Sequence, residues 1–312
     1  MKNKIYLKSL ILVIMMLGAV ANIVPTALSK QSERIIAVNE LANTWIVDNE
    51  GDGDFTSIQA AIDNATAGDT IEVYSGTYNE NLIINKSIDL EGKNVEYLNG
   101  TDSGKPVISG VSLNNVITIN TNNQDVPVKV TNFMIKNAGE SHAGIFIQDS
   151  ESVTISYNDV IQNHHGIQLY YCSNVNLQEN FISNNEFGIF TEFSDHCILT
   201  LNYIENSSYG VRLSVSNLMT VTQNELKDNG YGLILLESIG NQVFYNNFIN
   251  NNRQAWFENG LNFWHDNYWS NRPAIIPIFI IIGQIQSSII PILKIPFLQF
   301  DLRPAATPYD IS

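Results

Sequence analysis

The sequence predicts an all-β fold, a parallel β-helix built from 22-residue coils, and two observations predict it. The first is a glycine column with a constant 22-residue step, formed by Gly144, Gly166, Gly188, Gly210 and Gly232. The second is the alternation of apolar residues after each glycine, such as Ile145 and Ile147, which has the period of two of a β-strand. Because no insertion interrupts the spacing, residues one coil apart must lie above one another, as in a solenoid.

Two polar columns keep the same step and are expected to have a structural role. One is asparagine throughout, and the other, five residues later, is asparagine with one serine. Their members are Asn158, Asn180, Asn202, Asn224 and Asn246, then Asn163, Asn185, Ser207, Asn229 and Asn251. Such side chains bond to one another along a stack of strands. A coil alone buries about five apolar side chains at ~1.5–3 kcal/mol each, less than the ~1–2 kcal/mol per residue that ordering its backbone costs, so the coils must stabilise one another.

The repeat unit Gly-Ile-x-Leu-x-x-Ser-x-x-Val-x-Ile-x-x-Asn-x-Ile-x-x-Asn resembles that of right-handed parallel β-helix proteins. These include NosD-like copper-maturation proteins, carbohydrate-binding and sugar-hydrolase (CASH) domains and pectate-lyase-like enzymes. The resemblance covers residues 45–271, with the regular coils at 144–253. It implies a single-stranded, right-handed β-helix but no particular activity, because that architecture carries many functions.

Residues 1–29 are typical of an export signal, since lysines precede an apolar run from Leu10 to Val20 and small residues follow near Ala27. Either a cleaved signal peptide or an uncleaved N-terminal anchor fits this pattern. Residues 30–44 are a polar linker. We therefore expect an extracellular or cell-surface protein that meets a membrane only through an uncleaved N-terminal segment.

A short amphipathic helix is expected to cover the first coil. Thr56 and Gln59 have the spacing of a capping box, and Ile58, Ala61, Ile62 and Ala65 share one helical face. The helix would protect strand edges that are otherwise open.

Acidic residues alternate just before this helix, at Asp48, Glu50, Asp52 and Asp54. Calcium loops space their oxygen ligands in this way, but no glutamate follows at the EF-hand distance. An acidic turn before a helix N-terminus explains the pattern as well. We expect no cofactor, with calcium on Asp48, Asp52 and Asp54 as the alternative.

The chain ends in a segment, 272–312, that is rich in proline and isoleucine. Its apolar runs are too short and broken for a membrane helix, so we predict extended strands that cap the last coils. A membrane or partner contact is the alternative. Just before it, Asp266-Asn-Tyr-Trp-Ser resembles the ending of NosD-like repeats, and the tryptophans there are expected to cover the open end.

Composition excludes several functions. The net charge is −15, with 16 Lys and Arg in 312 residues, which repels nucleic acid, acidic membranes and polyuronates.

Cys172 and Cys197 fall at different columns of adjacent coils, which favours two buried free thiols over a disulfide. Four Asn-x-Ser/Thr sequons are compatible with glycosylation, at Asn64, Asn85, Asn99 and Asn206.

The candidate site lies on outward strand positions around the glycines. The ligand-binding candidates are Gln168, Tyr170, Phe190, Tyr209 and Tyr231. Aromatic rings with a few polar groups suit the apolar face of a sugar. Stacked rings that stabilise neighbouring coils explain the same pattern.

The catalytic candidates are Glu192, Arg212 and His165, with Glu192 and Arg212 expected to form a surface ion pair. No three carboxylates align on one strand face, which argues against a hydrolase. The scarcity of basic residues argues against a uronate lyase. The five histidines are scattered, and no Met or Cys joins them as a soft copper ligand, so the copper role implied by the resemblance lacks ligands here.

We therefore expect a non-catalytic, exported protein that binds a polysaccharide, a cell-surface glycan or a protein. The alternatives are a polysaccharide lyase, epimerase or hydrolase acting through the three catalytic candidates, and a NosD-like copper-centre maturation protein.

Overall fold

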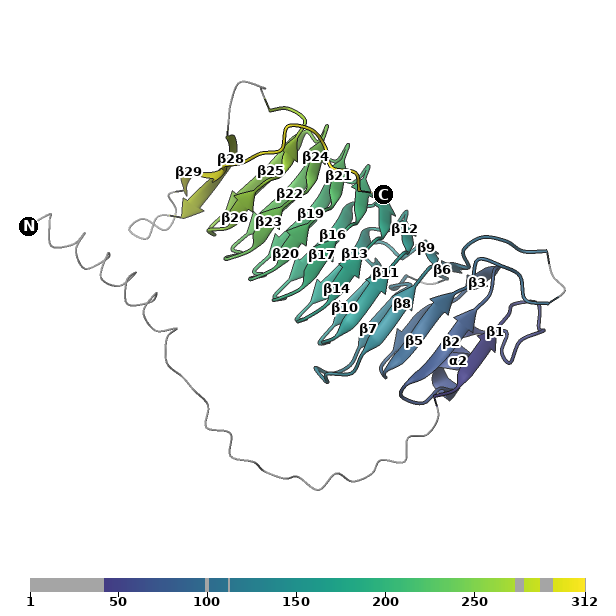
Figure 1. Ribbon diagram of the computed structural model, residues 1–312. Helices are drawn as coiled ribbons and strands as arrows, with labels where there is room; N and C mark the ends of the chain where they lie inside the picture. The colour runs from purple at the N-terminus through teal and green to yellow at the C-terminus, as the bar shows by residue number, and fades with distance from the viewer. Residues whose placement is uncertain (1–41, 99–100, 112, 273–277, 287–293, 312) are drawn as a thin grey trace, which may run out of the picture. The chain divides into compact units, whose positions relative to one another are not determined.

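The computed structural model (Figure 1) describes residues 42–98, 101–111, 113–272, 278–286 and 294–311. The predicted export signal and nearly all of the predicted linker lie outside the described residues. Among the residues described, no helix is both long enough and apolar enough to cross a membrane.

Three strips of parallel strands wind into one β-solenoid (Figure 1). The first strip holds β4 (Leu82–Ile84), β7 (Ile117–Asn120), β10 (Ala143–Gln148), β13 (His165–Tyr170), β16 (Phe187–Glu192), β19 (Tyr209–Ser214), β22 (Tyr231–Leu236), β25 (Arg253–Glu258) and β28 (Phe279–Gln286). The second holds β1 (Thr44–Val47), β2 (Asp69–Val73), β5 (Ile88–Gly92), β8 (Val128–Thr131), β11 (Val153–Ser156), β14 (Asn176–Gln178), β17 (Ile198–Thr200), β20 (Thr220–Thr222), β23 (Gln242–Phe244), β26 (Phe263–His265) and β29 (Lys294–Asp301). The third holds β3 (Thr77–Asn79), β6 (Val107–Ser109), β9 (Met134–Lys136), β12 (Asp159–Ile161), β15 (Phe181–Ser183), β18 (Tyr203–Glu205), β21 (Glu225–Lys227), β24 (Asn247–Ile249) and β27 (Tyr268–Trp269).

The register confirms the predicted 22-residue coil. Ile145 of β10 pairs with Ile167 of β13, and Ile167 pairs with Ile189 of β16. These aliphatic side chains are fully buried in the interior. The glycine column stands where coils approach most closely, because a Cβ on Gly188 would lie 2.5 Å from the carbonyl oxygen of Gly210.

The asparagine columns form buried ladders, as predicted. Asn180 Nδ2 donates to Asn202 Oδ1 at 3.0 Å, and Asn202 Nδ2 donates to Asn224 Oδ1 at 2.9 Å. The same oxygens accept the backbone N–H of the preceding asparagine, at 3.1 Å for Asn180. Each ladder therefore satisfies backbone donors at a turn that water does not reach.

The N-terminal helix α2 (Ile58–Asn64) buries Ile58, Ala61 and Ile62 of the predicted face. Ala65, the fourth residue of that face, is buried but is the C-cap residue, and the predicted N-terminal cap is wrong. Ser57, not Thr56, is the N-cap residue, and its Oγ accepts the N–H of Ala60. The carboxylate of Glu80 accepts the N–H groups of Ile58 (2.9 Å) and Gln59 (3.0 Å). Glu80, which lies 23 residues after the N-cap residue, therefore caps the helix N-terminus in place of the predicted local capping box.

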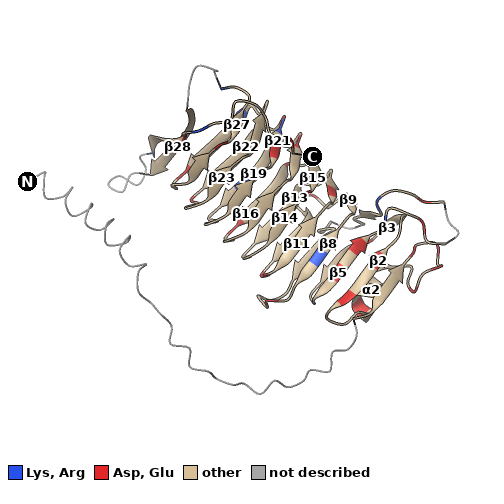
Figure 2. Ribbon diagram, viewed as in Figure 1, with Lys and Arg blue, Asp and Glu red and all other residues tan. Residues whose placement is uncertain are grey.

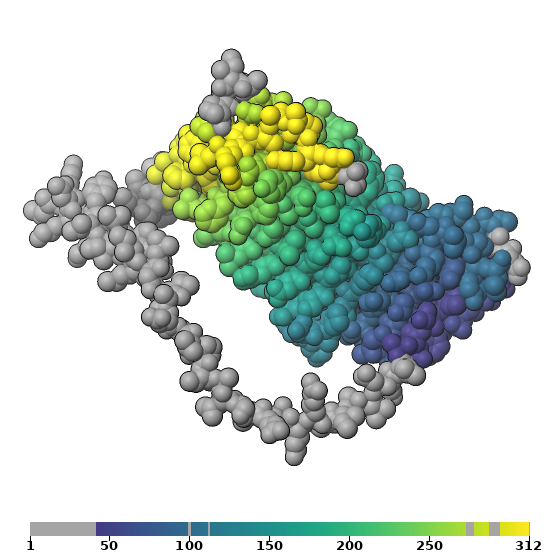
Figure 3. All heavy atoms as spheres, in the orientation of Figure 1, coloured from purple at the N-terminus to yellow at the C-terminus, as the bar shows by residue number. Residues whose placement is uncertain are grey.

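At the other end, β28 and β29 form an antiparallel hairpin that covers the last coils, which confirms the extended C-terminal cap. Trp269, fully buried, is stacked between Phe248 and Phe279 with centroid distances of 4.2 Å on both sides. The chain then runs back over the coils (Figure 3), where the backbone of Tyr309 exchanges two hydrogen bonds with the Asn247 side chain.

Cys172 and Cys197 are buried free thiols, as predicted. Burial raises the pKa of Cys172 to about 11 and that of Cys197 to about 12. Three of the sequon asparagines, Asn64, Asn85 and Asn206, are exposed, and Asn99 lies outside the described residues.

Candidate functional site

The column that precedes the glycines forms one continuous stack of rings, called here the aromatic column. It consists of His165, Phe187, Tyr209 and Tyr231, with centroid distances of 5.0, 4.8 and 5.3 Å and interplanar angles of 22°, 7° and 10°. Arg253 closes it, with its guanidinium carbon 5.6 Å from the Tyr231 centroid. Because each ring covers the next, the column joins neighbouring coils, as cross-strand aromatic pairs do.

The catalytic candidates are not assembled as a set. The guanidinium carbon of Arg212 lies 5.0 Å from the centroid of Phe190, and Arg212 Nε donates to Ser214 Oγ at 3.3 Å. The expected ion pair with Glu192 is not formed, because register places Arg212 beside Phe190 and Ser214 beside Glu192. Stacking on the ring replaces the ion pair.

His165 is buried at the start of the aromatic column, with 8% of its surface exposed. Desolvation first, then the nearby His164, Arg212 and His142, lower its pKa to about 4. Its Nδ1 lies 3.2 Å from Nδ1 of His164. A neutral, buried imidazole among aromatic rings has a packing role, and nothing among the described contacts joins it to Glu192.

A second group of rings lies on the corner that follows the first strip, called here the exposed cluster: Tyr170, Tyr171 and Phe193. Tyr171 and Phe193 stack with centroids 4.9 Å apart at 12°, and Tyr170 meets Tyr171 edge-on at 4.5 Å. Tyr171 is 49% exposed and Phe193 is 40% exposed. Tyr171 and Phe193 are therefore each more exposed than any ring of the aromatic column, whose members are buried or half-buried.

The corner has a left-handed backbone in every coil, whatever residue stands there. Its positive φ values fall at Asp149, Tyr171, Phe193, Val215, Glu237 and Asn259. For the two aromatic residues φ is 52° and 50°, and for Val215 it is 48°. Such a conformation is uncommon outside glycine, asparagine and aspartate. Turn composition pointed instead to Asn, Gly and Ser, so Tyr171 and Phe193 were missed, although their spacing of one coil was visible in the sequence.

Polar groups surround the exposed cluster. Glu192 directly precedes Phe193, and its carboxylate has no hydrogen-bond or ion-pair partner among the described residues. Asp149 stands one coil before Tyr171, and its carboxylate accepts the Gln148 amide at 3.0 Å. Carboxylates and an amide beside exposed rings can hydrogen-bond the hydroxyls of a bound molecule.

Two hollows of the surface lie away from these residues. One of about 730 Å³ is lined by Ile239, Leu261, Ile285 and Phe297, between the coils and the hairpin. Another, of about 310 Å³, lies beside Phe181. Neither is lined by the catalytic candidates, and the face that carries Glu192 and Arg212 is therefore not part of either hollow.

The acidic loop before α2 is held by its own backbone. Asp48 Oδ2 accepts the N–H groups of Gly51 and Asp52, and Asp54 Oδ2 accepts that of Ile46. Within the described ranges, the carboxylates that converge, to within 4.8 Å, are those of Glu50, Glu96 and Asp102. The charge of Glu96 is the largest cause that raises the pKa of Glu50. Calcium on Asp48, Asp52 and Asp54 stays a prediction.

The family follows from comparison with known proteins. A family model described as "Periplasmic copper-binding protein (NosD)" matches residues 62–283, which is most of the chain. The chain belongs to the NosD family. The match covers nearly all of the β-helix and ends inside β28.

Solved structures similar to this NosD-family chain share about an eighth of its residues. An alginate lyase from Paenibacillus sp. str. FPU-7 is 12% identical over 70% of this chain and 95% of that chain, with a TM-score of 0.40. A GH136 lacto-N-biosidase from Eubacterium ramulus is 12% identical over 72% of this chain and 60% of that one, at 0.41. Tailspike protein 2 of Escherichia coli O157:H7 bacteriophage CAB120 is 12% identical over 73% and 36%, at 0.45. No curated protein matches the chain, and these likenesses assign no activity.

The donors of this NosD-family chain do not fit copper. Both thiols face the interior, and the converging carboxylates are hard donors that suit calcium or magnesium. Of the histidines, His164 and His165 lie close to each other, and His165 is buried. No third soft or imidazole donor joins that pair among the described residues.

Proposed function

We propose that this NosD-family protein is an exported, non-catalytic binder of a neutral or weakly charged glycan, held at the exposed cluster of Tyr170, Tyr171 and Phe193. The observation that carries the proposal is the pair of outer rings. They are 49% and 40% exposed and stack on each other with centroids 4.9 Å apart.

The shape of the cluster suits a sugar. The stack is two rings high, because its neighbours in the same column are Asp149 and Val215, which carry no ring. No further ring therefore covers either end of the pair, and the two rings stay 49% and 40% exposed. The apolar face of a pyranose stacks on such a ring, while its hydroxyls reach Glu192, Asp149 and Gln148.

Charge limits the class of glycan. With a net charge of −15 and carboxylates beside the rings, the surface repels polyuronates and sulfated chains. A neutral polysaccharide or oligosaccharide meets no such repulsion.

The test is a screen of neutral glycans followed by calorimetric titration of Tyr171→Asn. Asparagine tolerates the left-handed conformation, so this variant should melt no lower than the wild type. Its affinity should fall at least about tenfold, or about 1.4 kcal/mol, through loss of the ring. Tyr157→Asn is the matched control, because Tyr157 is 47% exposed and has φ of 58° on another corner.

The same samples separate the alternatives. A wild type that releases product from the bound glycan, with Glu192→Gln losing that turnover, would favour the enzyme. Stoichiometric copper kept after dialysis would favour the copper role. Equal loss of affinity in Tyr157→Asn and Tyr171→Asn would remove the exposed cluster as the site.

A further inference from the structure

The outer surface of the C-terminal hairpin is an uncovered apolar face, called here the end face. Across β28 and β29, Ile280 pairs with Phe300 and Ile282 pairs with Leu298, so the four side chains share one side of the hairpin. They are 45%, 41%, 56% and 45% exposed, respectively. A contiguous apolar face of this kind marks an interaction surface.

The opposite side of the hairpin is already used. Ile281 is 1% exposed, and Gln299 accepts the indole N–H of Trp264 at 2.7 Å and donates to the Gly260 carbonyl. Alternation along both strands therefore separates a side packed on the coils from the end face, which nothing in the described ranges covers.

The end face carries no charge of its own. Arg253 lines a hollow beside Ile280 and Ile282 and stacks on the Tyr231 and Trp256 rings, and two further charges near the hairpin form ion pairs. Lys294 pairs with Glu258 at 2.6 Å, and Arg303 pairs with Asp266 at 2.9 Å. Acidic side chains gather instead at the far end of the coils, on β2, β5 and α2 (Figure 2). The converging carboxylates of Glu50, Glu96 and Asp102 belong to that far end.

We propose that the end face binds a second copy of this chain, end to end, about a two-fold axis. An uncharged apolar sheet face is complementary to itself, and a two-fold axis matches each patch with its own copy. This arrangement also holds the two acidic ends farthest apart, which a chain of net charge −15 favours over side-by-side association. The contact does not involve the exposed cluster and is independent of glycan binding.

The size of the face sets the expected strength. Four side chains with 41–56% of their surface exposed can bury no more than about 800 Å² over both copies, which lies below the range of stable, specific interfaces and fits a weak association. We therefore expect a reversible dimer that forms as concentration rises, rather than an obligate one.

The test is sedimentation velocity of the full chain and its variants from about 1 to about 200 µM, which spans the dissociation constants of weak, reversible complexes. The wild type should shift from monomer to dimer across this range. Ile282→Glu should weaken association at least about tenfold, because two like charges then face each other across the axis. An equimolar mixture of Ile282→Glu with Ile282→Lys should associate again. The control is Ile83→Glu, since Ile83 is 59% exposed on β4, near the acidic end.

Three results would overturn the proposal. They are a wild type that stays monomeric throughout, an Ile282→Glu variant that dimerises like the wild type with an unchanged melting temperature, and a monomeric wild type that floats with phosphatidylcholine vesicles. The last would assign the end face to a lipid surface.

Discussion

Single side chains in the asparagine ladder hold buried backbone groups of neighbouring coils. Asn202 Oδ1 accepts both the backbone N–H and the Nδ2 of Asn180, at 3.1 and 3.0 Å, and Asn202 is fully buried. In Asn202→Ala these two donors lose their acceptor, at ~1–3 kcal/mol each. We expect urea unfolding to show a loss of ~2–5 kcal/mol. Asn252→Ala, exposed and outside the ladder, should change stability by less than ~0.5 kcal/mol. Similar losses in the two variants would refute this role of the ladder.

His165 makes stability depend on pH in one direction. Its pKa is lowered from 6.5 to about 4 in the folded chain, chiefly by desolvation, so below pH 6.5 the unfolded chain binds the proton first. The contribution of His165 is therefore complete above about pH 6.5 and is lost as the pH falls towards 4, by about 3 kcal/mol in all. His165→Phe, which extends the rings of the aromatic column, should flatten that part of the stability curve. Unfolding at a series of pH values measures it, and an unchanged slope would contradict it.

Residues of the interior could be predicted because they repeat, whereas only Tyr170 of the exposed cluster was predicted and its two outer rings were not. Ile145 and Asn202 are fixed by the constant length of the coil and by alternation. Tyr171 and Phe193 follow no composition rule for turns, since the stacked coils impose the corner conformation on whichever residue stands there. Arg212 is a second example. The 22-residue spacing predicts which residues lie near it, but not that its guanidinium stacks on the Phe190 ring and forms no ion pair with Glu192.

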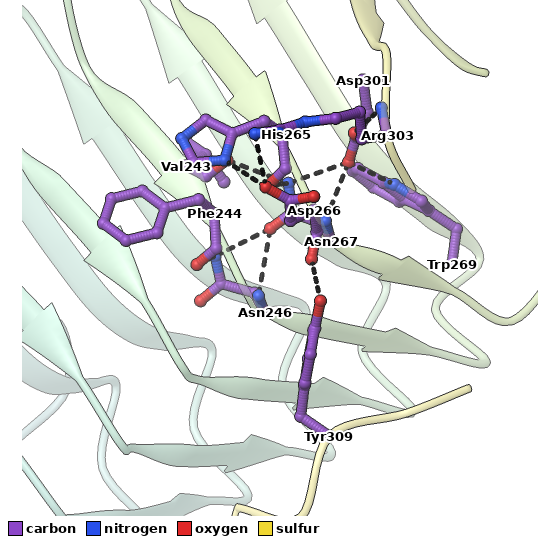
Figure 4. A network of polar contacts seen from close by, with 10 residues as sticks. All are labelled: Val243, Phe244, Asn246, His265, Asp266, Asn267, Trp269, Asp301, Arg303 and Tyr309. Carbon is purple, nitrogen blue, oxygen red and sulfur yellow. Dashed lines mark hydrogen bonds and ion pairs between the residues drawn. The ribbon is translucent and has the colours of Figure 1, made fainter. Parts of the chain in front are cut away.

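At the scale of elements, the hairpin cap ends the asparagine ladder with a carboxylate (Figure 4). Asp301 Oδ2 accepts the N–H and Nδ2 of Asn267 and the indole N–H of Trp269, all at 3.0 Å. Asn267 Oδ1 serves Asn246 in the same way one coil earlier. Asp301 thus supplies the oxygen that a further asparagine would offer.

We expect Asp301→Ala to loosen the cap before the coils. Three buried donors lose their acceptor, so β28 and β29 should lose about 3 kcal/mol of local stability. Asp301→Asn keeps one acceptor oxygen and should lose less. Hydrogen exchange resolved by peptide measures both, with the β13 and β16 peptides as the internal reference. Exchange in Asp301→Ala that matches the wild type would show that the carboxylate does not anchor the hairpin.

The two caps also show which features of secondary-structure elements can be predicted from sequence and which cannot. The helix and the terminal strands were predicted from amphipathic spacing and broken apolar runs. Their anchors, Glu80 and Asp301, are single carboxylates that meet their partners only after the chain has coiled. Local patterns therefore predict which segments cap the solenoid, but not how they are held.

At the scale of the whole molecule, the two proposed binding surfaces and the converging carboxylates are separated by position along the stack. The exposed cluster lies on a corner in the middle coils, the end face lies on the hairpin, and the converging carboxylates lie near the first coils (Figures 1 and 2). Each surface rests on its own coils. A substitution at one should leave the others unchanged, which makes the variants above separable.

Because the coils from β10 to β22 repeat the same strand register with their neighbours, the length of this part of the solenoid is adjustable in whole coils. Excising residues 189–210 would join Gly188 to Val211 and restore each ladder one step shorter. Removing 21 residues instead of 22 would shift the register of all following strands by one residue, so that their apolar, core-facing side chains would point to solvent. Such a protein can therefore become one coil longer by duplication, or one coil shorter by deletion, of 22 residues while it keeps the same core packing.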